Sequence, residues 1–240
     1  MKKNPSSVEE FIFNLTKPEI LKICEKEKDS PTLQFESYDH YCSRQIASCR
    51  HDIQKIVTFI QQGLEKVLSD FTARGDRQAI DELREKAEEF SRKISAQPDL
   101  ASLNGLFSPE QTLASILGYS NELLEKIYQS GVRYYQSHQF SDASHVLAAL
   151  NLLDPTFFSS WLSLGLALEK ERKWEESLEA LKVAFGLNDS DPIPHLHAAI
   201  CYKHLSKREE ADGEFNIASQ LAKNQPDLYI ADEIQRERLA

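Results

Sequence analysis

The sequence predicts an all-α protein in which a long helical hairpin precedes three tandem helical repeats and a C-terminal capping helix. Eight positions with similar side chains recur three times, 34 residues apart, between Ile127 and Lys223. Before these positions, apolar residues recur in alternating steps of four and three, the spacing of a coiled-coil seam. Glycine contributes only 8 of the 240 residues, which favours helix throughout. These three observations lead to the expected fold class.

The N-terminal region, residues 1–107, is predicted to contain short amphipathic helices followed by a long hairpin over about residues 38–97. The seam positions of its first helix are Cys42, Ile46, Cys49, Ile53, Ile56, Ile60, Gly63 and Val67. A turn at Arg74, Gly75 and Asp76 precedes a second stripe, and Asp76 can cap the helix that carries it. The two helices therefore form a hairpin whose apolar seam needs a partner.

A second domain, residues 108–240, is expected to hold the repeats. A short helix should end at Gly118, and Ser120 should cap the first repeat. The repeats are placed at 124–157, 158–191 and 192–225, with a capping helix at 226–239. Ser206 with Glu209 has the spacing of a capping box inside the third repeat.

The 34-residue period matches the tetratricopeptide pattern, in which each unit is a pair of antiparallel helices. Small residues fall where the two helices of a pair should cross, at Gly131, Gly165 and Ala199. Such residues let helix backbones approach closely. A stack of this kind provides a docking surface for other proteins.

The first helix of each pair should line the concave wall of the stack. Its inward positions carry mainly apolar and aromatic side chains: Tyr128, Val132 and Tyr135, then Leu162 and Leu166, then Leu196 and Ile200. Basic residues on these helices do not form the cluster needed to hold a carboxylate. The wall is thus expected to bind hydrophobic side chains of a partner. Two alternatives are that part of the same chain covers the wall, or that these residues are ordinary repeat core.

Several function classes are not expected. The net charge of −10 disfavours nucleic acid as a partner. The sequence has no apolar run near the ~20 residues that cross a bilayer and no signal-peptide core, so we expect a cytoplasmic protein without stable membrane insertion.

No catalytic, cofactor or metal site is predicted. The chain lacks a nucleophile elbow, a P-loop and an HExxH motif, so an enzyme is not expected. His40, Cys42, Cys49 and His51 suggest zinc ligands, but Cys42 and Cys49 lie about 10 Å apart along one helix, too far to share an ion.

Two runs of sequence resemble a known family more specifically than generic repeats do. These are residues 127–155, IYQSGVRYYQSHQFSDASHVLAALNLLDP, and the run PHLHAAIC that begins at Pro194. The chain from about residue 109 to 228 resembles the class II chaperones of bacterial type III secretion, the SycD and LcrH group. The resemblance implies a cytoplasmic bacterial chaperone whose groove holds an extended segment of a hydrophobic secreted translocator or effector. It also implies that Tyr128, Val132, Tyr135, Phe140 and Leu153 line the groove pockets.

The long N-terminal region has no counterpart in this resemblance, since members of the group usually carry only a short helix there. Its seam is expected either to mediate self-association or contact with a second secretion component, or to pack on the repeats as a stabilising arm. The main alternative to a chaperone is a repeat scaffold that links permanent components of a secretion or other multiprotein machine.

Overall fold

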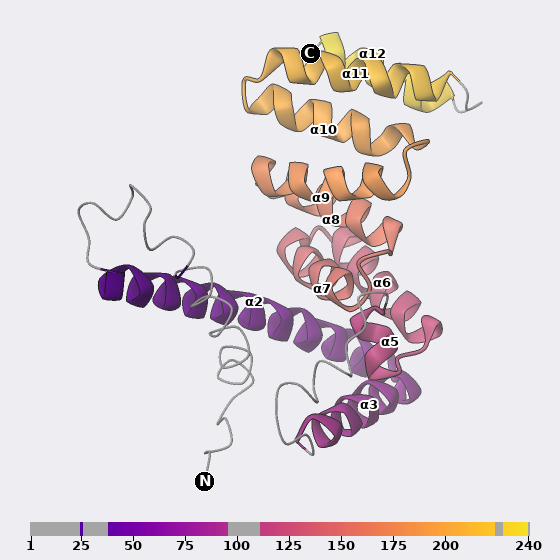
Figure 1. The fold of residues 1–240 in the computed structure, drawn as a ribbon. Helices are drawn as coiled ribbons and strands as arrows, with labels where there is room; N and C mark the ends of the chain where they lie inside the picture. The colour runs from indigo at the N-terminus through magenta and orange to yellow at the C-terminus, as the bar shows by residue number, and fades with distance from the viewer. Residues whose placement is uncertain (1–24, 26–37, 96–110, 224–227, 240) are drawn as a thin grey trace. The chain divides into compact units, whose positions relative to one another are not determined.

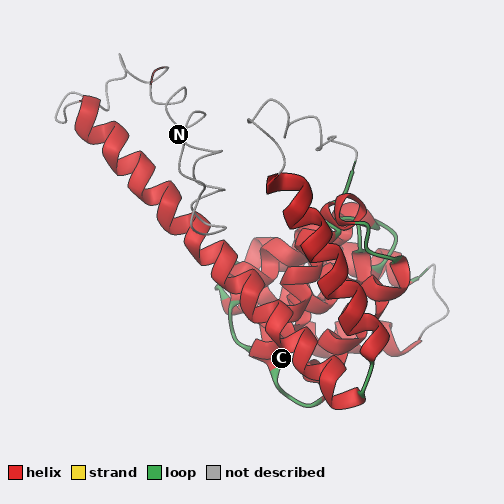
Figure 2. Ribbon diagram, turned by 90° about the horizontal axis from the view of Figure 1, so that it is seen from below, coloured by secondary structure: helices red, strands yellow, loops and turns green. Residues whose placement is uncertain are grey.

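The computed structural model describes residue 25 and residues 38–95, 111–223 and 228–239, and every regular element in these ranges is an α-helix (Figure 2). The predicted short helices before residue 30 and the predicted linker at 97–106 lie outside the described residues, apart from residue 25, which is helical. None of the helices described is both long enough and apolar enough to cross a membrane.

The chain divides into two compact units, residues 1–61 and residues 62–240. The described part of the first unit is chiefly the start of α2 (Tyr38–Arg74), where the Arg44 guanidinium lies 5.5 Å from the centre of the Tyr41 ring. The second unit contains the end of α2, α3 (Arg77–Ser95) and all later elements. The domain boundary between residues 107 and 108 stays a prediction.

Three helix pairs follow one another as the repeat pattern predicts (Figure 1). They are α6 (Asn121–Gln136) with α7 (Phe140–Leu153), α8 (Phe158–Lys170) with α9 (Trp174–Leu187), and α10 (Pro192–His204) with α11 (Arg208–Ala222). The helix α12 (Leu228–Leu239) contacts α11 and α10, and its Ile234 is buried in their core. The all-α repeat fold is therefore confirmed.

Caps and turns mark where several of these helices begin or end. The Ser120 side chain accepts a hydrogen bond from Leu123 N at 3.1 Å, and Asp76 Oδ1 accepts one from Ala79 N at 3.2 Å. The short helix α5 (Leu113–Leu117) ends at Gly118, whose φ of 73° is left-handed. The prediction of a capping box at Ser206 and Glu209 is wrong, because Ser206 is a turn residue with φ 61° and α11 begins two residues later, at Arg208.

The small residues of the 34-residue pattern lie at close helix crossings. A side-chain β-carbon built on Gly131 would come within 2.8 Å of Leu147, and one on Gly165 within 2.7 Å of Leu181. Each glycine thus lets the first helix of a pair approach a buried leucine of the second helix. Ser177 Oγ, on the partner helix of Gly165, donates a hydrogen bond to the Gly165 carbonyl at 2.8 Å.

A larger side chain in place of one of these glycines should push the two helices of the pair apart. We expect Gly165→Val to lower the free energy of unfolding by about 2–3 kcal/mol, since overpacking forces backbone shifts. Urea denaturation followed by circular dichroism measures the change. Gly186→Ala is the matched control, because a β-carbon there meets no atom within 4 Å. This control should stabilise the helix by up to about 1 kcal/mol, and an equal loss in both variants would contradict the crossing.

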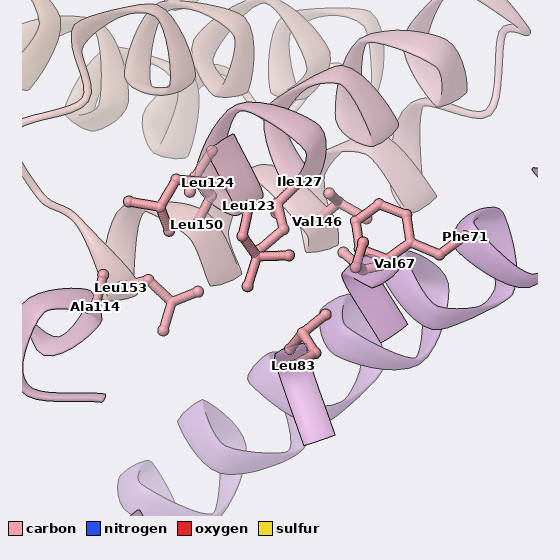
Figure 3. Packing of buried hydrophobic residues seen from close by; sticks show 11 residues of the cluster. Val67, Phe71, Leu83, Ala114, Leu123, Leu124, Ile127, Val146, Leu150 and Leu153 are labelled. Atoms are coloured by element: carbon pink, nitrogen blue, oxygen red, sulfur yellow. The ribbon is translucent and has the colours of Figure 1, made fainter. Parts of the chain in front are cut away.

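The end of α2 and the start of α3 share a hydrophobic core with the first repeat. Figure 3 shows Val67 and Phe71 of α2 and Leu83 of α3 pointing toward Leu123, Ile127 and Val146. Val67 and Phe71 are completely buried. This part of the hairpin therefore packs on the repeats as a stabilising arm, one of the two roles expected for it.

An ion pair supports the same contact between α2 and α6. Asp70 accepts hydrogen bonds from Arg133 Nε at 3.0 Å and from Ser130 Oγ at 2.7 Å. Burial raises the pKa of Asp70, but these hydrogen bonds and the Arg133 charge hold it below its ordinary value of 3.8. Tyr134 also donates a hydrogen bond to the carbonyl oxygen of Lys66 at 3.1 Å.

Candidate functional site

The first helices of the three repeats, α6, α8 and α10, form one wall, since α8 contacts both of the others. Most of the predicted groove residues are half-buried on these helices, with part of each side chain accessible. These half-buried residues are Tyr128, Val132 and Tyr135 on α6, Leu162 and Leu166 on α8, and Ile200 on α10. The assignment of these residues to a binding groove stays a prediction.

Tyr128 joins the first two repeats at this wall. Its ring centre lies 5.4 Å from that of Phe157, in a tilted arrangement typical of aromatic pairs. Its hydroxyl lies 3.2 Å from Ser163 Oγ, within hydrogen-bond distance. Phe157 and Ser163 therefore hold the Tyr128 ring in place. A partner that binds against this ring finds a rigid apolar surface, and little conformational entropy is lost on binding.

Tyr135 and Phe140 form a second aromatic pair at the end of the first repeat. Their ring centres lie 5.2 Å apart in an edge-to-face arrangement, and His138 lies at 5.7 Å from Phe140. Phe140 begins α7, so the tight turn after α6 brings it beside Tyr135. Two of the predicted groove residues, Tyr135 and Phe140, thus lie side by side at the end of the first repeat.

Two predicted groove residues lie in the core instead. Leu153 is 7% exposed and packs with the cluster that contains Phe71 and Leu83, while Leu196 is 2% exposed and packs against Phe215. Leu153 is buried because α5 and the hairpin contact the first repeat, which the 34-residue period could not reveal. Both residues support the wall from behind and leave almost no surface for a partner.

A polar pair on the wall was missed by the pattern of apolar positions. Glu169 on α8 is 8% exposed, and its Oε2 lies 2.6 Å from His197 Nδ1 on α10. Its other oxygen lies 3.4 Å from Lys170 Nζ. Glu169 occupies the position in the second repeat that Tyr135 has in the first. A charged residue at a position that is aromatic in another repeat was the sequence feature that could have indicated this polar pair. The pair links α8 to α10 by a charge-assisted hydrogen bond.

Protonation of Glu169 at low pH should lower the stability of the fold. Burial raises the pKa of this carboxyl, but the hydrogen bond and charge of His197 hold it below its ordinary value of 4.5. A carboxyl group whose pKa is lower in the folded chain than in the unfolded chain stabilises the fold at pH values above its unfolded-state pKa. This stabilisation is lost as the pH falls through the folded-state pKa. We expect the free energy of unfolding to fall as the pH drops below the ordinary carboxyl value of 4.5, and to fall less in Glu169→Gln.

Urea titrations at several pH values measure this difference. Glu179→Gln is a suitable control, because the Glu179 side chain is 75% exposed and lies on α9. The control should keep the wild-type dependence on pH. An unchanged pH dependence in Glu169→Gln would show that the pair does not stabilise the wall.

In the part of the chain that the structure describes, no three His, Cys, Asp or Glu side chains gather as ligands of one metal ion would. The side chains of Cys42 and Cys49 lie outside the described parts. Cys201 is buried, and this burial raises the pKa of its thiol to about 11 despite a hydrogen bond to Ser177 Oγ. A thiol with this pKa stays protonated and unreactive near neutral pH.

Comparisons with known proteins find relatives and structural neighbours of the repeat region. No protein-family model matches the chain. The low calcium response locus protein H of Yersinia pseudotuberculosis is 25% identical over 117 residues, which cover 49% of this chain and 70% of that protein.

Solved structures show the same fold. A chain of the CopN-Scc3 complex is 29% identical, with a TM-score of 0.51 over 64% of this chain and 98% of that chain. The type III secretion translocator chaperone SycD of Yersinia enterocolitica is 24% identical, with a TM-score of 0.50 over 52% of this chain and 95% of that chain. The resemblance to the SycD and LcrH group is thereby confirmed.

Proposed function

We propose that this chain is a chaperone of type III secretion, which holds an apolar segment of a secreted translocator or effector against the wall of α6, α8 and α10 before export. The observation that carries the proposal is the row of half-buried aromatic and aliphatic side chains on this wall, from Tyr128 and Tyr135 to Leu166 and Ile200. The resemblance to proteins of the SycD and LcrH group supports it.

Binding on this wall requires burial of apolar surface and no bond-making chemistry. A bound aliphatic segment removes apolar area from water on both sides, at about 25 cal/mol per Å². The aromatic pairs Tyr128–Phe157 and Tyr135–Phe140 are already packed, so little side-chain entropy is lost on binding. The client is thus kept from aggregating until it is exported from the cytoplasm of a bacterial cell.

The polar pair Glu169–His197 limits what the wall can accept. Glu169 is buried and already bonded to His197 and Lys170, so an acidic client side chain placed there would face a carboxylate. The wall therefore disfavours acidic segments, and it does not provide the basic clamp that repeat adaptors use for acidic peptide ends.

Purification of the tagged chain from the cells that make it tests this function. We expect mass spectrometry to find a secreted protein with long apolar segments in a defined complex with the chain. The chain should remain in the cell when that protein is secreted. Fractionation of the chain with an assembled membrane machine, with no secreted protein bound, would instead support the scaffold alternative.

A further inference from the structure

A hollow of about 250 Å³ lies where the start of α9 meets the end of α10, at the junction of the second and third repeats. Its lining residues come from α9, from α10 and from the turn after α10: Glu175, Glu176, Leu178, Glu179, Lys182, Tyr202, Leu205 and Lys207. Pockets for cofactors and drug-sized molecules measure roughly 300–1,000 Å³. The smaller hollow therefore suits one long side chain of a partner.

The equivalent junction between the first and second repeats is bridged by polar contacts. There the Ser144 hydroxyl donates a hydrogen bond to Glu171 Oε1 at 2.8 Å, and Glu171 Oε2 lies 2.8 Å from Lys173 Nζ. The residues 34 positions later are Leu178, Leu205 and Lys207. All three line the hollow. Leucine side chains cannot form this polar bridge, so the second junction has an apolar floor instead.

A tyrosine and a lysine show that the hollow attracts a cation. The Tyr202 ring is half-buried, and Lys207 Nζ lies 6.0 Å from its centre, which is within the range of a cation–π contact. The equivalent Lys173 pairs with a carboxylate in the preceding repeat. The face of the Tyr202 ring is thus already a place where a positive charge lies.

Carboxylates on the rim add to this attraction. Glu179 pairs with Lys182 at 2.8 Å, whereas no ion pair within the described ranges involves Glu175 or Glu176. Both of these side chains are exposed at the start of α9. A cationic side chain that entered the hollow would therefore meet two carboxylates that are accessible to it.

An aromatic stack holds the two helix ends that border the hollow. The rings of Trp174 and His204 lie parallel, with centres 4.0 Å apart. Trp174 precedes Glu175 on α9, and His204 precedes Leu205 at the end of α10. The stack thus fixes the residues that line the hollow before a partner arrives. Binding to such a preformed site loses little conformational entropy.

We propose that the hollow is a docking site for an arginine side chain of a partner protein. The guanidinium would stack on Tyr202 in place of the Lys207 ammonium, and its donors would reach the glutamates at the rim. The alkyl stem would lie on Leu178 and Leu205. Arginine is favoured over lysine because its planar group both stacks on aromatic rings and forms paired hydrogen bonds with carboxylates.

This docking site is separate from the wall proposed for the client. Tyr202 lies two residues after Ile200, which is about 200° around α10 and thus on nearly the opposite side of the helix. The partner that presents the arginine would therefore dock while a client is held on the wall of α6, α8 and α10. The inference does not depend on the proposed function.

NMR titration of the full chain with a capped peptide, Ala-Leu-Arg-Leu-Ala, tests the proposal. The methyl signals of Leu178 and Leu205 should shift, with a dissociation constant near 1 mM in order of magnitude. Citrulline has the shape of arginine without its charge, so the citrulline peptide should bind about 10-fold more weakly. The lysine peptide should bind about 3-fold more weakly, because it lacks the planar group.

Two single variants test the contact with the ring. Tyr202→Leu removes the ring, and the fold should tolerate it because the preceding repeat carries Leu168 at the equivalent position. This variant should bind the arginine peptide about 5-fold more weakly. Lys207→Ala removes the cation that already lies over the ring, and it should bind the peptide about 3-fold more tightly. Circular dichroism should remain helical in both variants.

A pair of double variants tests the rim. Glu175→Gln/Glu176→Gln should bind the arginine peptide about 5-fold more weakly. Glu209→Gln/Glu210→Gln is the matched control, because it removes two charges at the start of α11 from residues that do not line the hollow. The control should bind the peptide as the wild type does. Equal weakening in both double variants would show a general attraction to an acidic surface and overturn the proposal.

The absence of any shift with the arginine peptide at about 10 mM, in order of magnitude, would also overturn it. Equal affinities for the arginine peptide and either of the other two peptides would do the same, as would weaker binding in Lys207→Ala. Tyr202→Leu should capture the client as the wild type does. Failure of the peptide titration would therefore leave the proposed client wall untouched, and failure of client capture would leave this site untouched.

Discussion

Exchange of Val132 for glutamate together with Tyr135 for alanine should abolish capture of the secreted client. The first change places a charge among apolar side chains, and the second removes one ring of the Tyr135–Phe140 pair. Aromatic hot spots are each worth about 1–3 kcal/mol on truncation, and a charge left in an apolar contact costs more. Together these losses amount to at least a 100-fold weaker complex, in order of magnitude. Copurification with the client and calorimetric titration with its apolar segment measure the loss.

Both positions are only half-buried on α6, so the fold should tolerate the changes. Circular dichroism should remain helical, and the unfolding midpoint should move little. Leu152→Glu adds the same charge on α7 and should capture the client as the wild type does. A double variant that still binds the client with unchanged affinity would remove the wall as the binding site.

Phe71→Ala should have the largest effect on stability. Phe71 is completely buried among residues of α2, α3, α6 and α7, and truncation of such a ring leaves a cavity. We expect the free energy of unfolding to fall by about 3–5 kcal/mol. Chemical denaturation measures the loss, and hydrogen exchange should show faster exchange in α2 and α3 than in α10 and α11.

Thr72→Ala is the neighbouring control for this change. Thr72 is exposed, and its hydroxyl only donates a hydrogen bond to the Leu68 carbonyl within the same helix. The control should change the free energy of unfolding by less than about 0.5 kcal/mol. If Phe71→Ala were equally mild, the hairpin would not share a core with the first repeat.

The repeats could be predicted from sequence because each constraint acts over a short distance. Gly131 and Gly165 recur 34 residues apart since each must fit beside a leucine of the next helix, Leu147 or Leu181. Ser120 and Asp76 cap helices through bonds to residues three positions later. Local contacts of this kind leave a pattern that one sequence can reveal.

The contacts that the sequence did not reveal join distant parts of the chain. The family resemblance implies that Leu153 lines the groove, yet α5 and the hairpin bury it from outside the repeats. Glu169 and His197 lie 28 residues apart on different helices, and neither belongs to the apolar period. Ser206 has capping-box spacing, but the turn gives it a left-handed φ of 61° and places the helix start after it. In each case tertiary packing overrides a local signal.

The N-terminal hairpin stabilises the repeats through its second half. From Gln62 onward it packs on the first repeat through Phe71 and Asp70, which supports the stabilising-arm alternative for that half.

Site-specific photo-crosslinking shows where on the chain the client binds. A photoreactive phenylalanine replaces Leu166, at the centre of the wall, or Leu152, on the outside of α7, and the chain is illuminated in its complex with the client. We expect a crosslink from position 166 to an apolar segment of the client and none from position 152. Crosslinks from position 152 alone, or equal yields from both positions, would contradict binding of the client on the wall of α6, α8 and α10.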